Sequence, residues 1–252
     1  MVTRGTAVVT GASRGIGRDC ALRLAELGYD VAVGYHSRLD AAEEVVRQIE
    51  LYGRSAVAIP VETADPESCA AFVAGGRELG PVRAIVSNAT GFGIAAPQLG
   101  TAIATPPATY ETMVSARVGA LLALVAAAGS DLTDGGRIVA ITSTGTSRVI
   151  PGYAAIAAAM AATETVVRYL AVELGRTGVT ANVVSGGLVR TDALSEISAD
   201  PERMVAAVTR GTPSRRIAEP NDLAGVVGFL CSPEGGWVNG QTVVVDGGYS
   251  RC

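Results

Sequence analysis

A glycine-rich stretch near the N-terminus has residue types and spacing that suit the binding of phosphates. Gly11, Gly15 and Gly17 stand in the sequence Gly-Ala-Ser-Arg-Gly-Ile-Gly, between a short apolar run and a leucine-containing helical pattern. Glycines let the backbone approach a pyrophosphate closely, and a helix N-terminus offers N–H groups and a favourable dipole. A glycine-rich turn alone is often only structural, but its place between a strand and a helix predicts a dinucleotide site.

The end of the second apolar run indicates which nicotinamide cofactor is bound. An NAD site of this type would place an acidic residue there to hold the ribose hydroxyls. The run instead ends with Tyr35, His36, Ser37 and Arg38, and Asp30 lies before it. Arg14 and Arg38 could converge on a 2′-phosphate, which arginine recognises well. Either arginine alone is typical of a solvated surface charge, so the prediction of NADPH or NADP depends on the pair and on the missing acid.

The elements that must position these residues follow from seven short, β-rich apolar runs separated by helix-length segments. Continuous apolar runs indicate strands covered on both faces, and strand–helix alternation gives crossovers within one parallel sheet. We therefore predict an α/β, Rossmann-type, doubly wound parallel sheet of about seven strands with helices on both faces. The runs lie near Thr6, Asp30, Ser55, Arg83, Arg137, Val179 and Gln241.

No change in composition divides the chain, which predicts one NAD(P)-binding domain over residues 1–252. Two segments, 90–109 and about 186–213, look irregular, and each follows an apolar run. Ligand crevices of such sheets open beyond the carboxyl ends of the strands. We expect the substrate pocket there, with a substrate loop at about 186–213.

Composition favours a small-molecule partner. The net charge is −4, 17% of the residues are charged and 48% are hydrophobic, and there is no basic run. These values argue against nucleic acid and against a membrane surface as partners. The cysteines are scattered and the chain has one histidine, so no metal site is expected.

The location follows from two further features of the sequence. The N-terminal residues move directly into a strand pattern and lack the features of a signal peptide. The apolar run at 119–129 is too short to cross a bilayer. We expect a cytoplasmic protein with reduced thiols.

Several stretches resemble motifs of the short-chain dehydrogenase/reductase family along essentially the whole chain. "TGASRGIG" is similar to its cofactor loop, "SNA" at Ser87 to its N-A-G segment, "AITS" ending at Ser143 to its serine strand, and "VVDGG" to its C-terminal strand. Within the family, "RYLAVELG", "NVVSGGLVRTDAL", "TPSRR" and "GQTVVVDGG" are most similar to bacterial enoyl-acyl-carrier-protein reductases close to β-ketoacyl reductases.

The resemblance implies a changed catalytic set. Tyr153 stands ten residues after Ser143, which matches the Y-x6-K spacing of the enoyl reductases, whereas the ketoreductase register would place the tyrosine at Ile156. In both registers the lysine position is Met160. The family's asparagine, which holds a water in the proton relay, aligns with Arg117. The implied catalytic residues are therefore Ser143, Tyr153 and Arg117.

In the family the lysine helps to hold the nicotinamide ribose and lowers the tyrosine pKa. Without it, Tyr153 would stay near the ordinary pKa of about 10 and remain protonated at neutral pH. A protonated phenol suits carbonyl reduction better than alcohol oxidation. Arg117 could supply positive charge if its side chain points inward; an outward surface arginine is the alternative. Met160 is interpreted as a packing residue.

The resemblance also implies the cofactor-binding residues. Loop capping is the alternative for Asn88, Glu62 and Thr63, a surface position for His36, a turn hydroxyl for Ser143 and simple packing for Tyr153. The implied cofactor-binding set is Gly11, Ser13, Arg14, Gly15, Ile16, Gly17, Tyr35, His36, Ser37, Arg38, Glu62, Thr63, Asn88, Ala89, Gly186, Gly187, Val189 and Thr191.

The sequence thus predicts an NADPH-dependent reductase. We expect it to transfer hydride to the carbonyl of a bulky, aromatic polyketide-like substrate, as a tailoring ketoreductase of antibiotic biosynthesis. The alternatives are an enoyl-thioester reductase, a non-catalytic nucleotide-binding protein, and a redox-neutral enzyme that uses the nucleotide as a scaffold. A homotetramer or dimer is expected through two long apolar helices.

Overall fold

A computed structural model of the chain describes residues 4–90, 100–192, 194 and 200–251. Within these residues seven strands form one sheet in the order β3-β2-β1-β4-β5-β6-β7, and every neighbouring pair is parallel. The predicted fold class is confirmed. The strands are β1 (Thr6–Val9), β2 (Asp30–Tyr35), β3 (Ala56–Pro60), β4 (Val82–Ser87), β5 (Arg137–Ser143), β6 (Thr180–Gly186) and β7 (Thr242–Val245).

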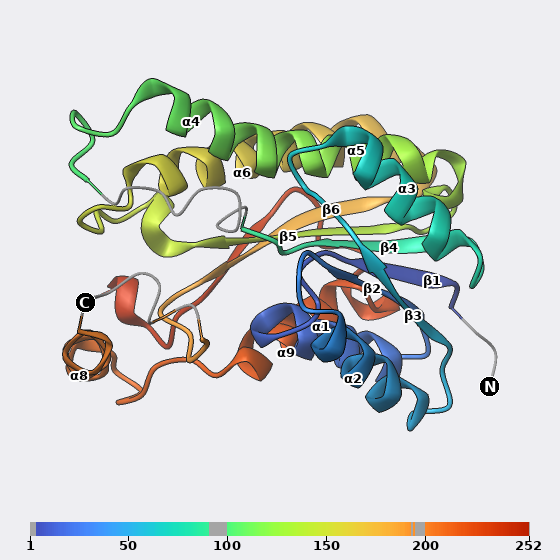
Figure 1. Cartoon of the computed structure of the whole chain (residues 1–252), viewed down its shortest axis with the longest axis horizontal. Helices are drawn as coiled ribbons and strands as arrows, with labels where there is room; N and C mark the ends of the chain where they lie inside the picture. The colour runs from blue at the N-terminus through green and yellow to red at the C-terminus, as the bar shows by residue number, and fades with distance from the viewer. Residues whose placement is uncertain (1–3, 91–99, 193, 195–199, 252) are drawn as a thin grey trace.

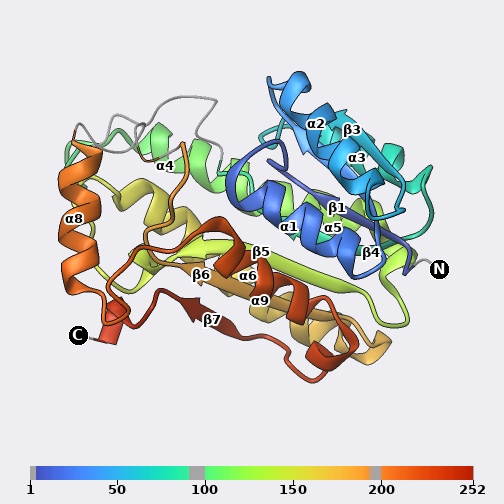
Figure 2. The same cartoon turned by 90° about the horizontal axis from the view of Figure 1, so that it is seen from below.

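Helices cover both faces of the sheet (Figure 1). One layer contains α1, α2 and α9, with α1 packed along α9 (Figure 2). The other layer contains α3, α5, α4 and α6, and a π-helical turn, η1 (Ser115–Gly119), joins α4 to α5. The helices are α1 (Gly15–Glu26), α2 (Leu39–Glu50), α3 (Pro66–Arg77), α4 (Pro107–Val114), α5 (Ala120–Ala128), α6 (Ala154–Leu174), α8 (Pro201–Gly211) and α9 (Pro220–Leu230).

The two layers bury separate apolar clusters, one on each face of the sheet. Leu24, Ile49 and Leu223 belong to the cluster under the first layer, and Phe72 and Leu124 to the cluster under the second. The central strands β1 and β4 are almost entirely buried because helices cover both of their faces. This explains why these strands are continuous apolar runs in the sequence.

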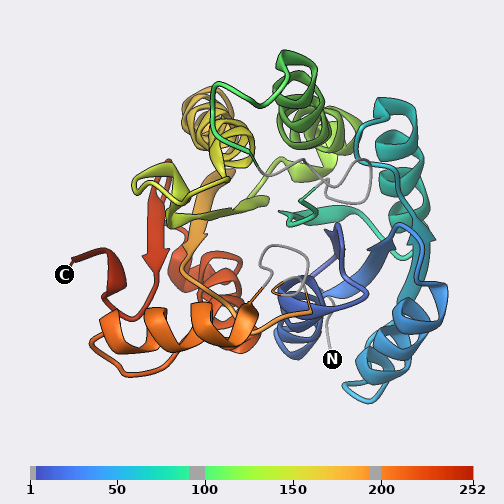
Figure 3. The same cartoon turned by 60° about the vertical axis from the view of Figure 1, so that its left-hand side comes forward.

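The order of the strands reverses between β1 and β4, because β2 and β3 lie on one side of β1 and β5 to β7 on the other. Ligands of such sheets bind at this switch point, beyond the carboxyl ends of the strands. Helix α8 lies apart from both helical layers, at the end of the sheet toward which the strands point (Figure 3). The topology therefore places a ligand site between α8 and the loops that follow β1, β4 and β5.

The expectation of irregular segments is partly wrong. Helix α8 occupies residues 201–211 of the segment 186–213, and α4 begins within the segment 90–109. Helix α8 is amphipathic, but none of its residues is buried, because its apolar face lines the cavity and does not pack in the core. Residues 91–99, 193 and 195–199, which belong to the two predicted pocket segments, lie outside the described residues.

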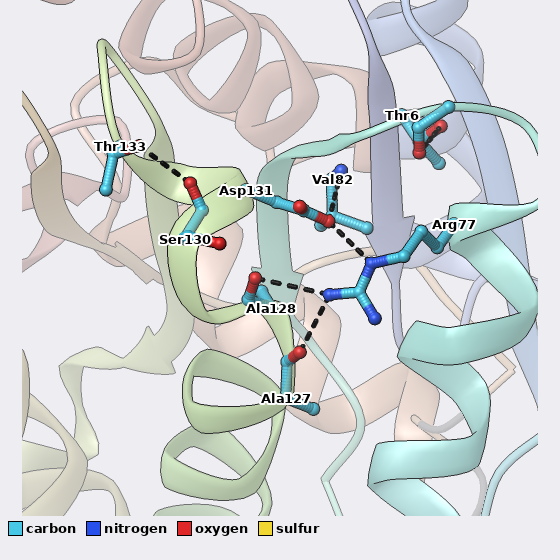
Figure 4. Close-up of polar contacts among 9 residues, drawn as sticks. Thr6, Arg77, Val82, Ala127, Ala128, Ser130, Asp131 and Thr133 are labelled. Carbon is cyan, nitrogen blue, oxygen red and sulfur yellow. Dashed lines mark hydrogen bonds and ion pairs between the residues drawn. The ribbon is translucent and has the colours of Figure 1, made fainter.

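Arg77 joins the C-terminal ends of α3 and α5 to the start of β4 (Figure 4). Arg77, at the end of α3, donates from Nε to Asp131 Oδ2 at 2.7 Å and from Nη2 to the carbonyl of Ala127 at 2.9 Å. Asp131 also accepts from the N–H of Val82 at 3.2 Å. Since a cation at a helix C-terminus is favourable, Arg77 both caps α5 and joins it to α3 and β4.

The apolar run at 119–129 belongs to a longer helical segment than the sequence suggested. Segments 107–132 and 154–177 are long and apolar enough to cross a bilayer by length and composition alone. Both pack against the sheet, and Leu121, Leu124 and Val167 lie in its apolar cluster. Some of their apolar side chains are buried against the sheet, and others are exposed on the outer faces of the helices.

Candidate active site

The glycine-rich loop between β1 and α1 has a backbone and a close packing that require glycine. Gly11 and Gly15 have positive φ angles of 63° and 56°, which disfavour any other residue. A Cβ at Gly17 would lie 2.2 Å from the carbonyl oxygen of Gly11. Helix α1 begins without a side-chain cap or an acidic residue in its first turn. The loop and the helix N-terminus therefore fit the pyrophosphate of a dinucleotide.

The end of β4 braces this loop. Asn88 donates from Nδ2 to the carbonyl of Thr10 at 3.0 Å and of Gly11 at 3.3 Å. The backbone N–H groups of Asn88 and Ala89 donate to Thr10 Oγ1 at 3.0 and 3.1 Å. The side chain of Asn88 thus supports the loop, as the capping alternative expected, while the residue also lines the adjacent cavity.

The two arginines predicted for a 2′-phosphate each lie near a carboxylate. Arg14 Nη1 is 3.8 Å from Asp192 Oδ2, and Arg38 Nε is 3.6 Å from Asp40 Oδ1. These contacts are long and their side chains are exposed, so they contribute little and a phosphate dianion could displace them. At the same sheet edge, no acidic residue occupies the end of β2.

The other residues predicted for the nucleotide end lie after β2 and β3. His36 Nε2 is 3.0 Å from Glu62 Oε2, so these two side chains bind each other across the ends of neighbouring strands. Glu62 also accepts from the N–H of Ala64 at 3.1 Å, which caps the turn before α3. Thr63 is buried. Their position at the edge of the sheet suits an adenosine, although their contacts also stabilise the turn.

Ser143 and Tyr153 come together beside a cavity of about 660 Å³. Ser143 ends β5 and accepts from the N–H of Gly145 at 3.0 Å, and its side chain hydrogen-bonds Tyr153 at the start of α6. A Cβ at Gly145 would lie 2.8 Å from the ring of Tyr153. A glycine at position 145 therefore makes room for the phenol next to Ser143, a requirement that the sequence did not indicate.

Met160 occupies the space beside the phenol. Its Sδ lies 3.9 Å from the hydroxyl of Tyr153, and both residues line the cavity. A spacing of seven residues on α6 brings the two side chains together. The thioether carries no charge, so Met160 cannot stabilise a phenolate as an ammonium would.

Arg117 points inward, and the alternative of an outward surface arginine is wrong. The side chain lies in η1 and is 2% exposed. It donates from Nη1 to the carbonyl of Ala89 at 2.8 Å and from Nη2 to the carbonyl of Ile141. Its Nε has no hydrogen-bond partner within the described part of the chain. Arg117 does not line the cavity itself. Its partner Ile141, near the end of β5, does line it, so the guanidinium lies just behind the cavity wall.

The electrostatics keep the phenol neutral. Burial raises the pKa of Tyr153, while the hydrogen bond from Ser143 and the charge of Arg117 oppose this shift. Burial likewise lowers the pKa of Arg117 to about 10, and Tyr153 opposes that shift. At neutral pH the site therefore holds a protonated phenol next to a buried guanidinium cation.

The cavity joins the predicted nucleotide residues to a largely apolar space. Its lining includes Ile16, Gly186, Gly187, Val189 and Thr191 of the predicted cofactor set. One face of α8 also lines the cavity, with Arg203, Met204, Ala207 and Val208, and these residues lie within the substrate loop predicted at about 186–213. The sequence did not indicate the other two contributions, from the loop before Tyr153 and from the C-terminal segment: Val149, Ile150, Pro151 and Tyr249.

The chain is similar along nearly its whole length to proteins described as reductases or dehydrogenases. Residues 11–250 match the profile of the enoyl-(acyl carrier protein) reductase family. An NADPH-dependent aldehyde reductase-like chloroplast protein of Arabidopsis thaliana is 36% identical, over 96% of this chain and 93% of that protein. Versicolorin reductase 1 of Aspergillus parasiticus is 33% identical, over 97% of this chain and 96% of that protein. A short-chain dehydrogenase of Burkholderia cenocepacia, solved with NADP, has a TM-score of 0.85 at 33% identity, covering 97% of each chain.

Proposed function

Because this chain belongs to the short-chain dehydrogenase/reductase family, we propose that it is an NADPH-dependent reductase of a bulky, aromatic polyketide-like ketone. One observation carries the proposal. Tyr153, hydrogen-bonded by Ser143, lines the same largely apolar cavity as Ile16 of the glycine-rich loop and Gly186 at the end of β6. A hydride acceptor in that cavity would present its oxygen to a hydrogen-bond donor.

The proposed cofactor is NADPH. The glycine-rich loop has backbone angles that favour glycine at Gly11 and Gly15, and α1 begins without a side-chain cap, so its first N–H groups are available to a pyrophosphate. The end of β2 lacks the acid of NAD sites and carries Arg38, while Arg14 belongs to the loop itself. Similarity to a protein solved with NADP supports this choice. When bound, NADPH would supply the hydride.

The chain's own residues would act on the oxygen of the substrate. Tyr153 is positioned to donate a hydrogen bond and then its proton to the oxygen that gains negative charge. The hydroxyl of Ser143 would hydrogen-bond both the phenol of Tyr153 and the carbonyl oxygen of the substrate. A neutral phenol is an acid but not a base, so we propose a preference for reduction over alcohol oxidation.

Arg117 is proposed to act through Tyr153. Its guanidinium lies behind the wall of the cavity and is held by the carbonyls of Ala89 and Ile141. The positive charge stabilises the phenolate that forms when the proton leaves Tyr153. The sequence contains no lysine, so arginine is the only side chain with a permanent positive charge that this chain could use. Arg117 is thus a positioning and electrostatic residue.

The cavity supports the proposed substrate class. Its volume of about 660 Å³, which the substrate would share with one end of the cofactor, and its largely apolar lining suit an apolar ligand. Versicolorin reductase 1, a similar protein by sequence, is named for an aromatic substrate, which supports a tailoring ketoreductase of secondary metabolism such as antibiotic biosynthesis. We propose a homo-oligomer, because the outer faces of α5 and α6 expose Leu122, Tyr169 and Val172. The proposal of a cytoplasmic location depends on the sequence alone.

A second candidate is an enoyl-thioester reductase. The family profile and the seven-residue spacing of Tyr153 and Met160 favour it. The uncharged Met160 weakens it, since in the resembling enzymes the lysine also fixes the cofactor. A nucleotide-binding protein without turnover is the third candidate.

NADPH oxidation distinguishes these functions. The first predicts oxidation with quinonoid or β-keto substrates, the second only with an enoyl thioester, and the third binding without turnover. Replacing Tyr153 by Phe should lower kcat for ketone reduction by about 100-fold while NADPH binding is retained, because the oxygen loses its acid. Unchanged turnover with bound NADPH would remove Tyr153 from the mechanism.

A further inference from the structure

We infer that the C-terminal segment and α8 form a subsite for a fused aromatic ring, in which Tyr249 determines ring-size specificity. The inference rests on the proposed function in taking the same cavity as the substrate site. Tyr249 lines that cavity although it lies about a hundred residues from the catalytic loop in sequence. Its placement can be traced to three sets of contacts.

Arg148 fixes the ring of Tyr249 from one side. The guanidinium carbon lies 4.2 Å from the ring centroid, within the range of a cation–π contact. Arg148 Nη1 also donates to the carbonyl of Tyr249 at 2.6 Å. The ring and its backbone are thus held by a single side chain.

Asp246 fixes the backbone that carries the ring. Its Oδ1 accepts from the N–H of Gly248 at 2.9 Å and its Oδ2 from the N–H of Ser250 at 2.7 Å. Gly247 and Gly248 have positive φ angles of 63° and 88°, which allow the sharp turn between them. The sequence Asp-Gly-Gly-Tyr therefore turns the chain back so that Tyr249 faces the cavity.

Helix α8 leaves space for the ring and supplies the facing wall. A Cβ at Gly211 would lie 2.9 Å from Cε2 of Tyr249, so the glycine admits the ring at the end of α8. Met204, Ala207 and Val208 line the cavity at helical spacing, on the same face of α8. The thioether and the aliphatic groups of α8 and the ring of Tyr249 together give this part of the cavity an apolar surface, with Asp200 and Arg203 also in its lining.

A flat aromatic system matches this part of the cavity better than an aliphatic chain. Either ligand gains free energy from burial, but only a ring gains the additional aromatic and sulfur–aromatic contacts with Tyr249 and Met204. Arg148 belongs to the connection between Ser143 and Tyr153, so it joins the ring wall to the catalytic loop. Packing of a ring on Tyr249 would therefore help to set the position of the reacting carbonyl, and Arg148 is a positioning residue.

The test measures binding by calorimetry to the NADP⁺-loaded protein, with two probes of equal charge. Anthraquinone sulfonate has three fused rings and benzenesulfonate has one. We expect the protein to bind the first more tightly, and Tyr249→Ala to weaken it about tenfold while the affinity for benzenesulfonate stays unchanged. Arg148→Gln should reduce the same preference, because the ring of Tyr249 loses the contact that holds it. Tyr249→Phe should retain the preference.

Two further variants keep the test decisive. Tyr249→Leu replaces the ring by an apolar side chain if Tyr249→Ala does not fold, and it should also lose the preference. Tyr52→Ala removes an exposed tyrosine at the end of α2 and should change neither affinity. Equal binding of both probes by the wild-type protein, or equal losses for both probes in Tyr249→Ala, would overturn the inference.

Turnover separates this inference from the proposed function. If no ketone oxidises NADPH but the ring preference depends on Tyr249, the subsite stands and the reductase assignment fails. If ketones are reduced but Tyr249→Ala keeps the ring preference, the reductase assignment stands and the subsite is wrong.

Discussion

The phenol of Tyr153 is surrounded by groups that differ in their effect on its proton. Burial raises its pKa, whereas Ser143 and Arg117 lower it. Met160, in contact with the hydroxyl, does neither. The balance leaves an acid at neutral pH, and this suits a reaction in which the substrate oxygen takes up a proton. The missing ammonium is therefore more costly for alcohol oxidation than for ketone reduction.

Replacing Met160 by Lys should restore a base. The new ammonium would lie beside the Tyr153 hydroxyl and lower its pKa, so phenolate would form at lower pH. Alcohol oxidation with NADP⁺ needs the phenolate, and its rate rises as pH increases through the pKa of Tyr153. We expect the ascending limb of the oxidation profile to move to lower pH and the rate at neutral pH to increase about tenfold or more.

Two variants of similar size control this prediction. Met160→Leu keeps the apolar contact without adding charge, and it should leave the pH profile of oxidation unchanged. Arg117→Gln, made in the Met160→Lys background, should move the limb back toward higher pH because a charge that favours phenolate is lost. A profile of Met160→Lys that coincides with that of the wild-type protein would contradict the electrostatic account.

At the scale of elements, the sequence was most informative where both faces of a strand are buried. The runs in β1, β4 and β5 consist mostly of valine, alanine and isoleucine and do not alternate with polar residues. They therefore predicted strands that are buried on both faces of a parallel sheet. The glycine-rich turn was equally clear, because positive φ at Gly11 and Gly15 requires that residue type.

Other features could not be predicted because they depend on tertiary contacts. The apolar face of helix α8 lines the cavity and does not pack in the core, so its place in the fold depends on the loops around it. The inward direction of Arg117 depends on the π-helical turn, which changes the helical period by which facing residues are counted. Gly145 and Tyr249 were missed because their importance comes from partners far along the chain or across a loop.

The connection between α3 and α5 gives a prediction for stability. Partial burial raises the pKa of Asp131, but hydrogen bonds from Arg77 and Val82 outweigh it and hold the pKa below its usual range. A carboxylate with a lowered pKa contributes stability above its unfolded-state pKa of about 3.9, and this contribution is lost as pH falls through the folded pKa. Asp131→Asn should therefore be less stable than the wild-type protein at neutral pH and nearly equal to it in acid.

The expected size is small because Arg77 is half-exposed and solvent screens the pair. We expect a loss of about 1 kcal/mol, seen as a melting temperature lower by about 2–4 °C in calorimetry at neutral pH. Asp134→Asn is the matched control, since Asp134 is an exposed neighbour with φ of 65°, a conformation that asparagine also accepts. A destabilisation of Asp131→Asn that does not change between neutral and acid pH would contradict the linkage.

At the scale of the whole molecule, the distribution of exposed apolar side chains differs between faces. The outer layer of α5 and α6 exposes Leu122, Tyr169 and Val172, which are 44%, 66% and 80% exposed. A second group lies at the β7 edge, where Trp237 is 98% and Phe229 is 45% exposed. Two such faces on one molecule of 25.5 kDa suit two different contacts with further copies of the chain.

These two faces make dimer and tetramer distinguishable by experiment. Light scattering should give a multiple of 25.5 kDa, and introducing glutamates at Tyr169 and Val172 should reduce it, because charge on a buried contact is unfavourable. Leu51→Glu, at an 87% exposed position on the α2 side, should have no effect.

Trp237 is the single tryptophan, so its fluorescence reports on the β7 edge alone. A tetramer that uses both faces should give a blue-shifted emission that moves to the red on dilution. A dimer through α5 and α6 should keep the emission of a solvated indole at every concentration, and a wild-type mass of 25.5 kDa would contradict both assemblies.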